Sequence, residues 1–242
     1  MLIASFPAGP WQANCFLVAA GPGAECLILD PGVDAADDVR SVVAEHRLRP
    51  VAVIASHGHL DHTYSVAELC AAYEVPCWIN GADRDLLADP FAAMPPGVDT
   101  MLGEAGYRTE FVEPDRVETL ADGDRPTLAG FELTVVAAPG HTPGSMLLRT
   151  PYQDPGPATG GEPITELIFS GDVLFAGSIG RTDLPRGNPA NMLETLRTTM
   201  AGLPDSAAVL PGHGSQTTMA RERAANPYLQ PDYLHQEVEE PS

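Results

Sequence analysis

Basic residues are scarce in this chain. Its 242 residues include 13 lysines and arginines against 33 aspartates and glutamates, which gives a formal charge of −20 at pH 7. Binding to nucleic acid needs a stripe of basic residues that neutralises phosphates, and the few basic residues here are scattered along the sequence. The composition therefore argues against nucleic acid as a partner, and against anionic membrane surfaces for the same reason.

Long apolar runs and closely spaced cysteines are also missing. No stretch reaches the roughly 18–20 apolar residues of a membrane-spanning helix. The first residues, MLIASFPAGPW, lack a basic segment, and Pro7 and Pro10 interrupt their apolar run, unlike a secretory signal peptide. The four cysteines form no CxxC pair, and each stands beside apolar residues, as is typical of buried free thiols. These absences predict a cytoplasmic protein without disulfides.

A hydrophobic content of 44% suits one large core, and no shift in composition divides the chain. We therefore predict one domain over residues 1–229, followed by an acidic, loosely held tail over 230–242. Residues 90–116 carry proline, glycine and methionine without a clear period, which predicts an irregular excursion and favours a surface loop over a substrate-facing flap. The glycines and prolines of 151–163 predict a hairpin loop.

Short apolar runs bounded by glycine and proline predict strands, and apolar residues at helical spacing among charges predict helices. Strands are expected over 2–6, 14–20, 25–30, 51–55, 76–79, 131–138, 145–150, 166–170 and 207–210, and helices over 34–46, 63–73, 81–89, 190–201 and 216–225. Strands alternate with helices in both halves of the chain. This order favours two sheets faced with helices over an all-α or all-β fold.

Three histidines and an aspartate directly follow the apolar run 51–55, in the sequence HGHLDH (57–62). His57 and His59 are two apart, so an extended backbone points both imidazoles to the same side, where they can share a metal ion. Asp61 and His62 follow where the chain turns into the next expected helix. Imidazole and carboxylate are ligands for zinc and similar ions. The alternative is a chance run on a solvated loop.

Other histidines favour the metal site over that alternative. His141 in PGHTPGS and His213 in PGHGS each come just past an expected strand, and Asp172 follows the strand in IFSGD. A single histidine at a strand end is more often a satisfied polar residue, and an aspartate there is often a cap. Two histidines in one context, beside the HGHLDH cluster, reverse that preference. His46 and His235 are expected at solvent-exposed positions without a role.

Five histidines and two aspartates thus stand at the ends of four expected strands. Three protein ligands for each metal ion leave an open position, which is typical of a catalytic site, whereas a closed structural site takes four. Seven ligands with one bridging carboxylate make two such open sites that share a solvent molecule. The sequence therefore predicts a catalytic centre with two divalent metal ions.

Taken in order, the motifs HGHLDH (57–62), PGHTPGS (139–145), FSGDVLF (169–175) and PGHG (211–214) resemble those of the metallo-β-lactamase superfamily, over about residues 12–227. Within it, NCFLV, LILDPG, GDVLFAGSIGRTDLPRG and TTMARERAANPYL resemble the short form of the glyoxalase II type, the hydroxyacylglutathione hydrolases. The resemblance implies an α/β fold, a four-layer αβ/βα sandwich of two mixed sheets flanked by helices. The site would lie along the edge of the two sheets.

The resemblance also implies roles for the seven residues. One metal ion would bind His57, His59 and His141, and a second Asp61, His62 and His213, with Asp172 bridging. Zinc is the usual metal of the superfamily, and the glyoxalase II branch also accepts iron or manganese. The two ions would lower the pKa of a shared water so that hydroxide attacks a carbonyl carbon near neutral pH. Asp61 would orient that hydroxide, and with His57 and His59 it forms the predicted catalytic set.

The implied substrate is a small-molecule thioester of the S-(2-hydroxyacyl) thiol type. Arg181 stands where the family places a basic residue that helps to hold the glutathione carboxylate, but the family's nearby tyrosine has no counterpart at Thr182 or Asp183. The family's full-length enzymes also carry a C-terminal helical domain that grips glutathione, whereas 29 residues follow His213 here (242 − 213). Another thiol carrier is therefore a second candidate. The sequence indicates no oligomeric state.

Three alternatives stay open. Hydrolysis of a lactone, lactam or phosphodiester uses the same fold, although a lactamase is normally secreted and a nuclease would need basic surface. A persulfide dioxygenase, an oxidoreductase with a GRTD segment like residues 180–183, uses one iron and would leave the second metal position without use. A degenerate domain that only binds a partner usually loses ligands, whereas all seven are present here.

Overall fold

The computed structural model describes residues 1–153 and 163–236. Most residues of its central strands are apolar, because both faces of these strands are largely buried. Along β2 (Ala13–Ala19), Cys15 and Leu17 pack against helices, whereas Phe16 and Val18 pack against a second sheet. Successive side chains of a strand point to opposite faces. One strand therefore contributes to two hydrophobic cores, and the fold is built in layers.

The first sheet contains six strands in chain order. They are β1 (Leu2–Ala8), β2, β3 (Glu25–Leu29), β4 (Arg49–Ile54), β5 (Cys77–Asn80) and β6 (Val117–Leu120). The first three pair antiparallel and the last four parallel, so the sheet is mixed.

The second sheet has the order β15-β14-β11-β10-β9 and is also mixed, because β11 and β14 are parallel while the other neighbours are antiparallel. Its strands are β9 (Thr134–Ala137), β10 (Met146–Pro151), β11 (Glu166–Gly171), β14 (Ala207–Pro211) and β15 (Thr217–Thr218). Two small hairpins add β7 (Thr127–Leu128) with β8 (Phe131–Glu132) and β12 (Leu174–Phe175) with β13 (Ser178–Ile179).

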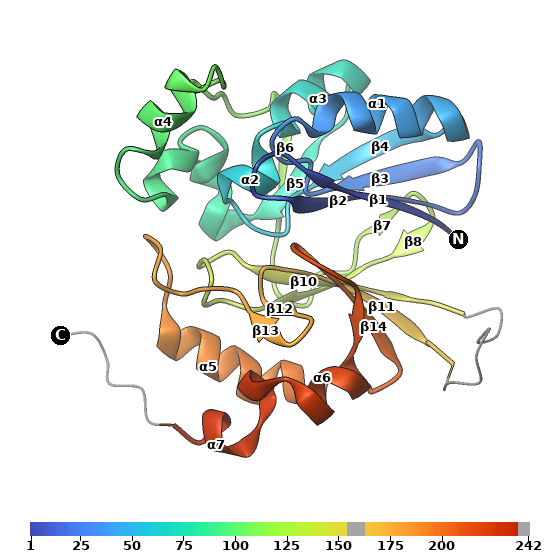
Figure 1. Ribbon diagram of the computed structural model, residues 1–242. Coiled ribbons are helices and arrows are strands. Elements are labelled where there is room, and N and C mark those ends of the chain that lie inside the picture. Colours follow the sequence, from blue (N-terminus) through green and yellow to red (C-terminus); the bar gives the residue numbers. More distant parts are fainter. Residues whose placement is uncertain (154–162, 237–242) are drawn as a thin grey trace.

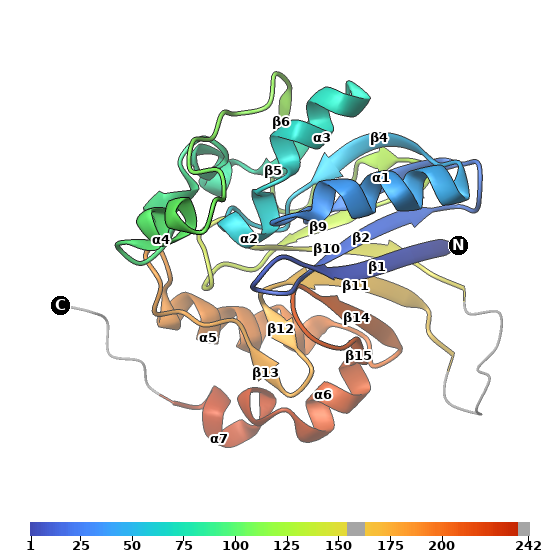
Figure 2. The ribbon, with the colours of Figure 1, turned by 45° about the horizontal axis from the view of Figure 1, so that its top comes forward.

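Helices cover the outer face of each sheet (Figures 1 and 2). Above the first sheet lie α1 (Ala35–His46) and α3 (Val66–Tyr73), and below the second lie α5 (Pro189–Thr198) and α6 (Met219–Ala225). Shorter helices and 3-10 turns are α2 (Leu60–Thr63), η1 (Gly81–Leu87), η2 (Pro90–Ala93), α4 (Val98–Glu104), η3 (Met200–Gly202), η4 (Pro227–Leu229) and α7 (Pro231–Leu234). The predicted four-layer sandwich of two mixed sheets is confirmed.

Three segments differ from the sequence predictions. The stretch 90–116, expected to be irregular, contains α4. The strand expected over 131–138 is interrupted at Leu133, because its first residues pair with β7 and its last with β10. At the expected loose tail, α7 is folded: Tyr233 and Leu234 pack against the core below the second sheet, and Arg197 donates to the carbonyl of Gln236 at 2.6 Å. Residues 154–162 of the expected hairpin loop and 237–242 of the tail lie outside the described residues.

The strands that precede the candidate ligands end at one edge of the sandwich. Since β9 and β11 are both antiparallel to β10, and β11 is parallel to β14, all three run in the same direction. Hydrogen bonds join their loops to the first sheet: the amide of Met146 donates to the carbonyl of Ser56 at 3.1 Å, and that of Asn14 to Gly212 at 2.6 Å. The two halves of the chain thus meet where the site lies.

Gly32 sets the position of α2, the helix that carries Asp61 and His62. A Cβ atom at Gly32 would stand 1.7 Å from the backbone oxygen of Asp61, so a larger residue cannot fit while α2 stays in place. The hydroxyl of Ser65 donates to the Gly32 carbonyl at 2.7 Å and fixes the same contact from the other end of the helix.

We expect Gly32→Ala to lower the free energy of unfolding by about 1–3 kcal/mol or more, because the methyl group overlaps a backbone that cannot move freely. Urea unfolding followed by circular dichroism measures the change. Gly21→Ala is the matched control, since nothing lies within 4 Å of its added Cβ atom. Equal stability of the two variants would contradict the assigned role of Gly32.

Candidate metal centre

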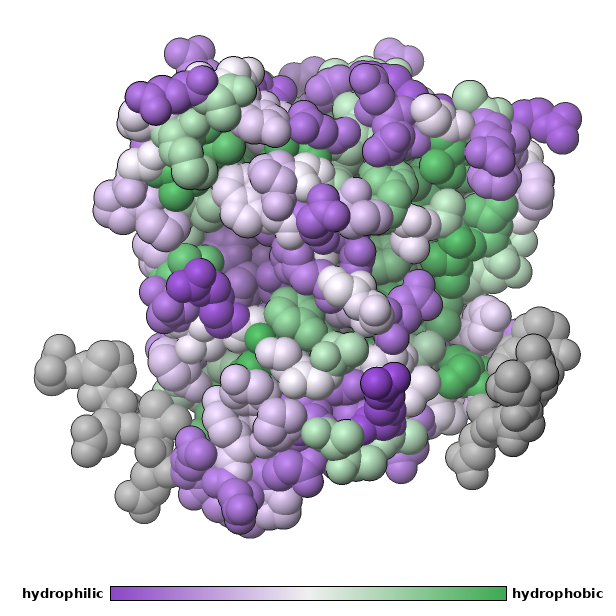
Figure 3. All heavy atoms as spheres, in the orientation of Figure 1, coloured by the Kyte–Doolittle hydropathy of each residue, from purple (hydrophilic) through white to green (hydrophobic). Residues whose placement is uncertain are grey.

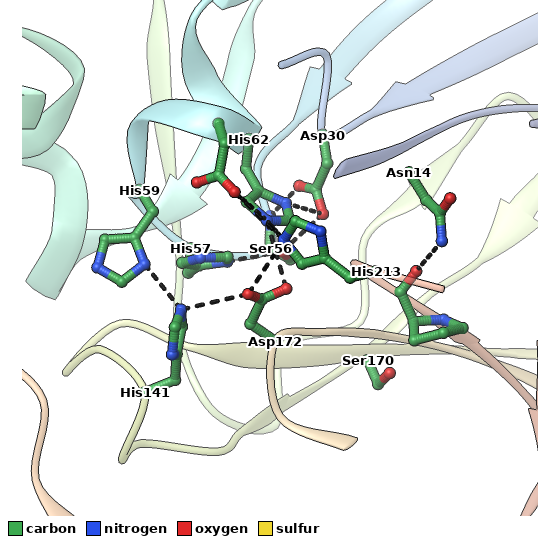
Figure 4. Close-up of polar contacts among 12 residues, drawn as sticks. Asn14, Asp30, Ser56, His57, His59, His62, His141, Ser170, Asp172 and His213 are labelled. Atoms are coloured by element: carbon green, nitrogen blue, oxygen red, sulfur yellow. Dashed lines mark hydrogen bonds and ion pairs between the residues drawn. The ribbon is translucent and has the colours of Figure 1, made fainter. Parts of the chain in front are cut away.

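The seven predicted residues converge from both halves of the sandwich (Figure 4). His57 and His59 lie in the loop after β4, and Asp61 and His62 lie on α2. His141, Asp172 and His213 follow β9, β11 and β14. Their donor atoms form three groups, in each of which all the atoms lie within 4.8 Å of one another: His57, His59 and His141; His57, His62 and Asp172; and Asp61, His62 and His213.

Asp172 stands between the two outer groups. Its Oδ2 lies 3.5 Å from Nε2 of His141 on one side and 3.4 Å from Nε2 of His213 on the other. Its Oδ1 lies 3.3 Å from Nε2 of His62. Asp61 completes the second group, with Oδ2 at 3.2 Å from Nε2 of His213. The carboxylate of Asp172 therefore faces both outer groups at once.

Several of the imidazoles are oriented by an acceptor on the side away from the centre. His141 donates from Nδ1 to the carbonyl of Arg181 at 2.7 Å. His57 places Nδ1 3.1 Å from the hydroxyl of Ser56, which itself donates to Asp30 at 2.7 Å. Such outer contacts fix the tautomer, because a nitrogen that donates a proton outward leaves the other nitrogen with a free lone pair.

The donor set fits metal ions. His57 and His62 are fully buried, and Asp172 is 7% exposed. Among the described residues, Nε2 of His57 and Oδ1 of Asp172 are buried without a hydrogen-bond partner. Nε2 of His141 lies 2.7 Å from Nδ1 of His59 and carries its lone pair toward the centre, because His141 donates from Nδ1. Buried acceptors without a partner are costly, and a cation beside them removes that cost.

Two buried aspartates support the ligands and were not predicted from the sequence. Asp30 lies with Oδ2 3.2 Å from Nδ1 of His62 and accepts from both the amide and the hydroxyl of Ser56 at 2.7 Å. Asp30 ends the strand of LILDPG, so the pattern that identified Asp172, an acid directly after an apolar strand, could have found it.

Asp83 ties the two ligand loops together. Its carboxylate accepts hydrogen bonds from the amide of Gly58 at 2.9 Å, the amide of Gly144 at 2.8 Å and the hydroxyl of Thr142 at 2.6 Å. One loop carries His57 and His59, and the other carries His141. Asp83 lies within the first turn of a 3-10 helix, where nothing in the sequence distinguishes it from an exposed acid.

The two sides of the centre differ in their affinity for protons. Burial, together with the neighbouring imidazoles, holds the pKa of His57 well below its usual value and lowers the pKa of His59 to about 3. Burial also opposes protonation of His62 and His213, but the carboxylates of Asp172 and Asp61 outweigh it. They raise the pKa of His62 well above its usual value and that of His213 to about 9.

A cavity of about 440 Å³ opens over the centre. His59, Asp61, His141, Asp172 and His213 form part of its lining, and Arg181 lies on its wall. Figure 3 shows the recess between the two layers on the side of α4, with hydrophilic residues deep inside it. Pockets of this size accept small molecules, so the open face of the centre is accessible to a substrate.

Comparison with known proteins identifies the family. Residues 8–213 match the model of the metallo-β-lactamase superfamily. The chain belongs to this superfamily. The predicted resemblance is confirmed, and the match includes all seven residues of the centre. Among the described residues, the longest helices are too short or too polar to cross a bilayer.

Two curated relatives align along almost their whole length. An uncharacterized protein of Mycobacterium tuberculosis (strain H37Rv) is 37% identical over 95% of this chain and 98% of its own length. The hydroxyacylglutathione hydrolase GloC of Haemophilus influenzae is 30% identical over 95% of this chain and 98% of its own length. This superfamily member is thus similar along almost its whole length to a protein named as a hydroxyacylglutathione hydrolase.

Two solved structures share the fold and some sequence. The BLEG-1 B3 metallo-β-lactamase is 28% identical, with a TM-score of 0.75 over 94% of this chain and 99% of the other. TTHA1623, solved in a di-iron-bound form, is 31% identical, with a TM-score of 0.70 over 95% and 100%.

We expect metal binding to compete with protons. The pKa of His213 is about 9 in the folded protein and about 6.5 in the unfolded chain. Protonation of His213 therefore stabilises the folded metal-free protein fully below about pH 6.5. This contribution is lost as the pH rises through about 9. A metal ion needs the neutral imidazole, so its affinity rises over the same range. The increase in Tm on adding zinc should therefore be larger near pH 9 than near pH 6.5. His213→Ala should weaken this dependence, and an increase independent of pH would contradict it.

Proposed function

We propose that this member of the superfamily is a hydrolase that uses two divalent metal ions to cleave a thioester. The observation that carries the proposal is the pair of three-ligand groups on either side of Asp172, both reaching the cavity. Three protein ligands for each ion leave room for solvent and substrate. His57, His59 and His141 would hold one ion and Asp61, His62 and His213 the other, with Asp172 between them.

Bound ions would supply Lewis acidity, which lowers the pKa of water toward 7 and stabilises negative charge on a carbonyl oxygen. The chain's own residues provide the placement. Asp61 lines the cavity floor, so its carboxylate would accept a hydrogen bond from the attacking water and direct it at the carbonyl carbon. His57 and His59 are held by the loop that Asp83 ties down. Zinc is proposed as the metal, while the di-iron form of TTHA1623 supports iron as an alternative, as nitrogen and oxygen donors suit both.

Thioester cleavage is favoured over the alternatives by the similarity to the Haemophilus protein. The aligned region covers 98% of the Haemophilus protein and 95% of this chain, so the two have similar lengths. A chain of this length is therefore compatible with the activity in that protein's name. The similarity to the BLEG-1 lactamase supports β-lactam hydrolysis as a second candidate. A third solved structure, ETHE1 from Myxococcus xanthus, is 21% identical and shows the fold alone. We propose a cytoplasmic protein that acts on a small molecule without a nucleic-acid or membrane partner.

A hydrolysis screen tests the reaction class. Zinc-loaded protein is assayed with a 2-hydroxyacyl thioester, an oxygen ester of the same acid, a lactone and a β-lactam. We expect the thioester to give the largest kcat/KM, because the centre assists departure of a thiolate. Metal removal by a chelator should abolish the activity and zinc should restore it. Faster cleavage of the β-lactam than of any thioester would overturn the assignment.

We expect Asp172→Ala to lower metal content from two ions per chain toward one or less and to abolish hydrolysis, because the Asp172 carboxylate lies within 3.5 Å of a nitrogen in each outer group. Elemental analysis of the purified protein, alongside the thioester assay, measures both effects. His46→Ala is the control, since His46 belongs to none of the three donor groups and should leave both values unchanged. Retention of two ions with full activity in Asp172→Ala would contradict the bridging role.

A further inference from the structure

The β12–β13 hairpin forms one wall of the cavity over the metal centre. Phe175, Ser178 and Ile179 of this hairpin line the cavity. The ring of Phe175 lies edge-on to the imidazole of His213, with 5.9 Å between the ring centroids. Another part of the lining comes from the segment 90–116, for which a surface loop was the favoured prediction. A small molecule that reaches the ligands through this cavity therefore passes along the hairpin.

The two ends of the hairpin adjoin the metal centre. Asp172 directly precedes it, and Arg181, whose carbonyl accepts a hydrogen bond from a ligand imidazole, follows it. A Cβ atom at Gly180 would lie 1.8 Å from the backbone oxygen of Asp172, so the two ends are in direct contact. The hydroxyl of Ser170 donates to the carbonyl of Leu174 at 2.9 Å and fastens the first strand of the hairpin to β11. The base of the hairpin thus has its own attachments.

The tip of the hairpin is held separately, by Glu222 of α6. The amide of Gly177, whose φ of 75° is the left-handed conformation of a tight turn, donates to Oε2 of Glu222 at 2.8 Å. The hydroxyl of Thr217 donates to Oε1 at 2.6 Å. Glu222 is 1% exposed. A buried carboxylate is costly unless donors satisfy it, so these contacts are costly to break on either side.

Asn226, at the end of the same helix, makes a second connection to the hairpin. Its side chain is fully buried, and Nδ2 donates to the carbonyl of Ser178 at 3.0 Å and to Oε2 of Glu222 at 2.8 Å. Its Oδ1 accepts from the amide of Tyr228 at 3.0 Å. The side-chain amide cannot turn over without losing partners on both sides, so its orientation is fixed. Satisfied buried networks of this kind make the elements that they join rigid.

We propose that Glu222 and Asn226 are positioning residues for substrate binding, which hold the β12–β13 hairpin where it contacts the substrate. The residues that line the cavity, all of them described, include neither of the two, so both act through the hairpin. Both belong to TTMARERAANPYL, a motif that contributes none of the seven candidate ligands. The inference rests on the proposed function for the reaction in which it is measured. A wall that is already ordered binds a substrate without the cost of ordering it.

Steady-state kinetics of zinc-loaded protein, well below the Tm, tests the proposal. We expect Glu222→Ala to raise KM for the 2-hydroxyacyl thioester at least about fivefold and to leave kcat within about twofold, because the wall contacts ground state and transition state alike. Metal content should stay unchanged, since the base of the hairpin keeps its own contacts. Glu222→Gln should restore KM: its amide oxygen still accepts from Gly177, and its NH2 group donates to the hydroxyl oxygen of Thr217.

Hydrogen exchange of the Gly177 amide, followed by NMR, tests the contact itself. Glu222→Ala should speed this exchange at least about tenfold, because the amide loses its acceptor. Asn226→Ala keeps Glu222 and should also raise KM, which provides a second variant if Glu222→Ala does not fold. Arg221→Ala is the matched control, since Arg221 lies exposed on the same helix and should change neither KM nor exchange.

An unchanged KM in Glu222→Ala, or unchanged exchange at Gly177, would overturn the inference. A lower Tm without a rise in KM would show a structural role alone and would overturn it too. Cleavage of a β-lactam instead of a thioester would refute the proposed reaction, while the same comparison of KM values with that β-lactam still decides the inference. With no cleavage of any substrate the proposed function fails, and exchange at Gly177 alone decides whether Glu222 holds the hairpin.

Discussion

The structure depends on a cluster of imidazole nitrogens and carboxylate oxygens, several of which are buried without a hydrogen-bond partner in the described part of the chain. Imidazole nitrogens and carboxylate oxygens from both halves of the chain face each other across a few ångströms, in a place from which solvent is largely excluded. Hydrogen bonds on their outer sides orient His57 and His141. In the proposed metal centre, ions would make this arrangement stabilising, and the free energy of ion binding would then add to the free energy of folding. The two sheets position the ligands, and bound ions would in turn link the two halves of the chain.

Much of this could be predicted from the sequence because the decisive patterns are local. Strands buried on both faces are continuous apolar runs, and β2, β3, β4, β11 and β14 all have that pattern. The ligands follow such strands directly, and strand ends at one edge of a sheet bring side chains together. The spacing within HGHLDH also predicted that His57 and His59 point to the same side of the chain.

Other features could not be predicted because they are set by contacts between distant segments. Strands of two residues, such as β12 and β13, are too short to show a period. Asp83 resembles an exposed acid until the loops of Gly58 and Gly144 close around it. The pairing of Arg181 with Asp183 was equally hidden, although the residues are neighbours, because the sequence does not show which acceptor a flexible guanidinium takes.

Asp30 has a consequence for how the centre fills. It reaches His62 directly and His57 through Ser56, and these two imidazoles belong to opposite outer donor groups. A cation that polarises the ring of His57 or of His62 therefore changes the charge on the Asp30 carboxylate, which also supports the other ring. In the proposed two-metal centre, the first cation to bind would thus alter the basicity of a ligand of the second. The two positions would then be linked thermodynamically, and stepwise titration would yield unequal, interdependent association constants.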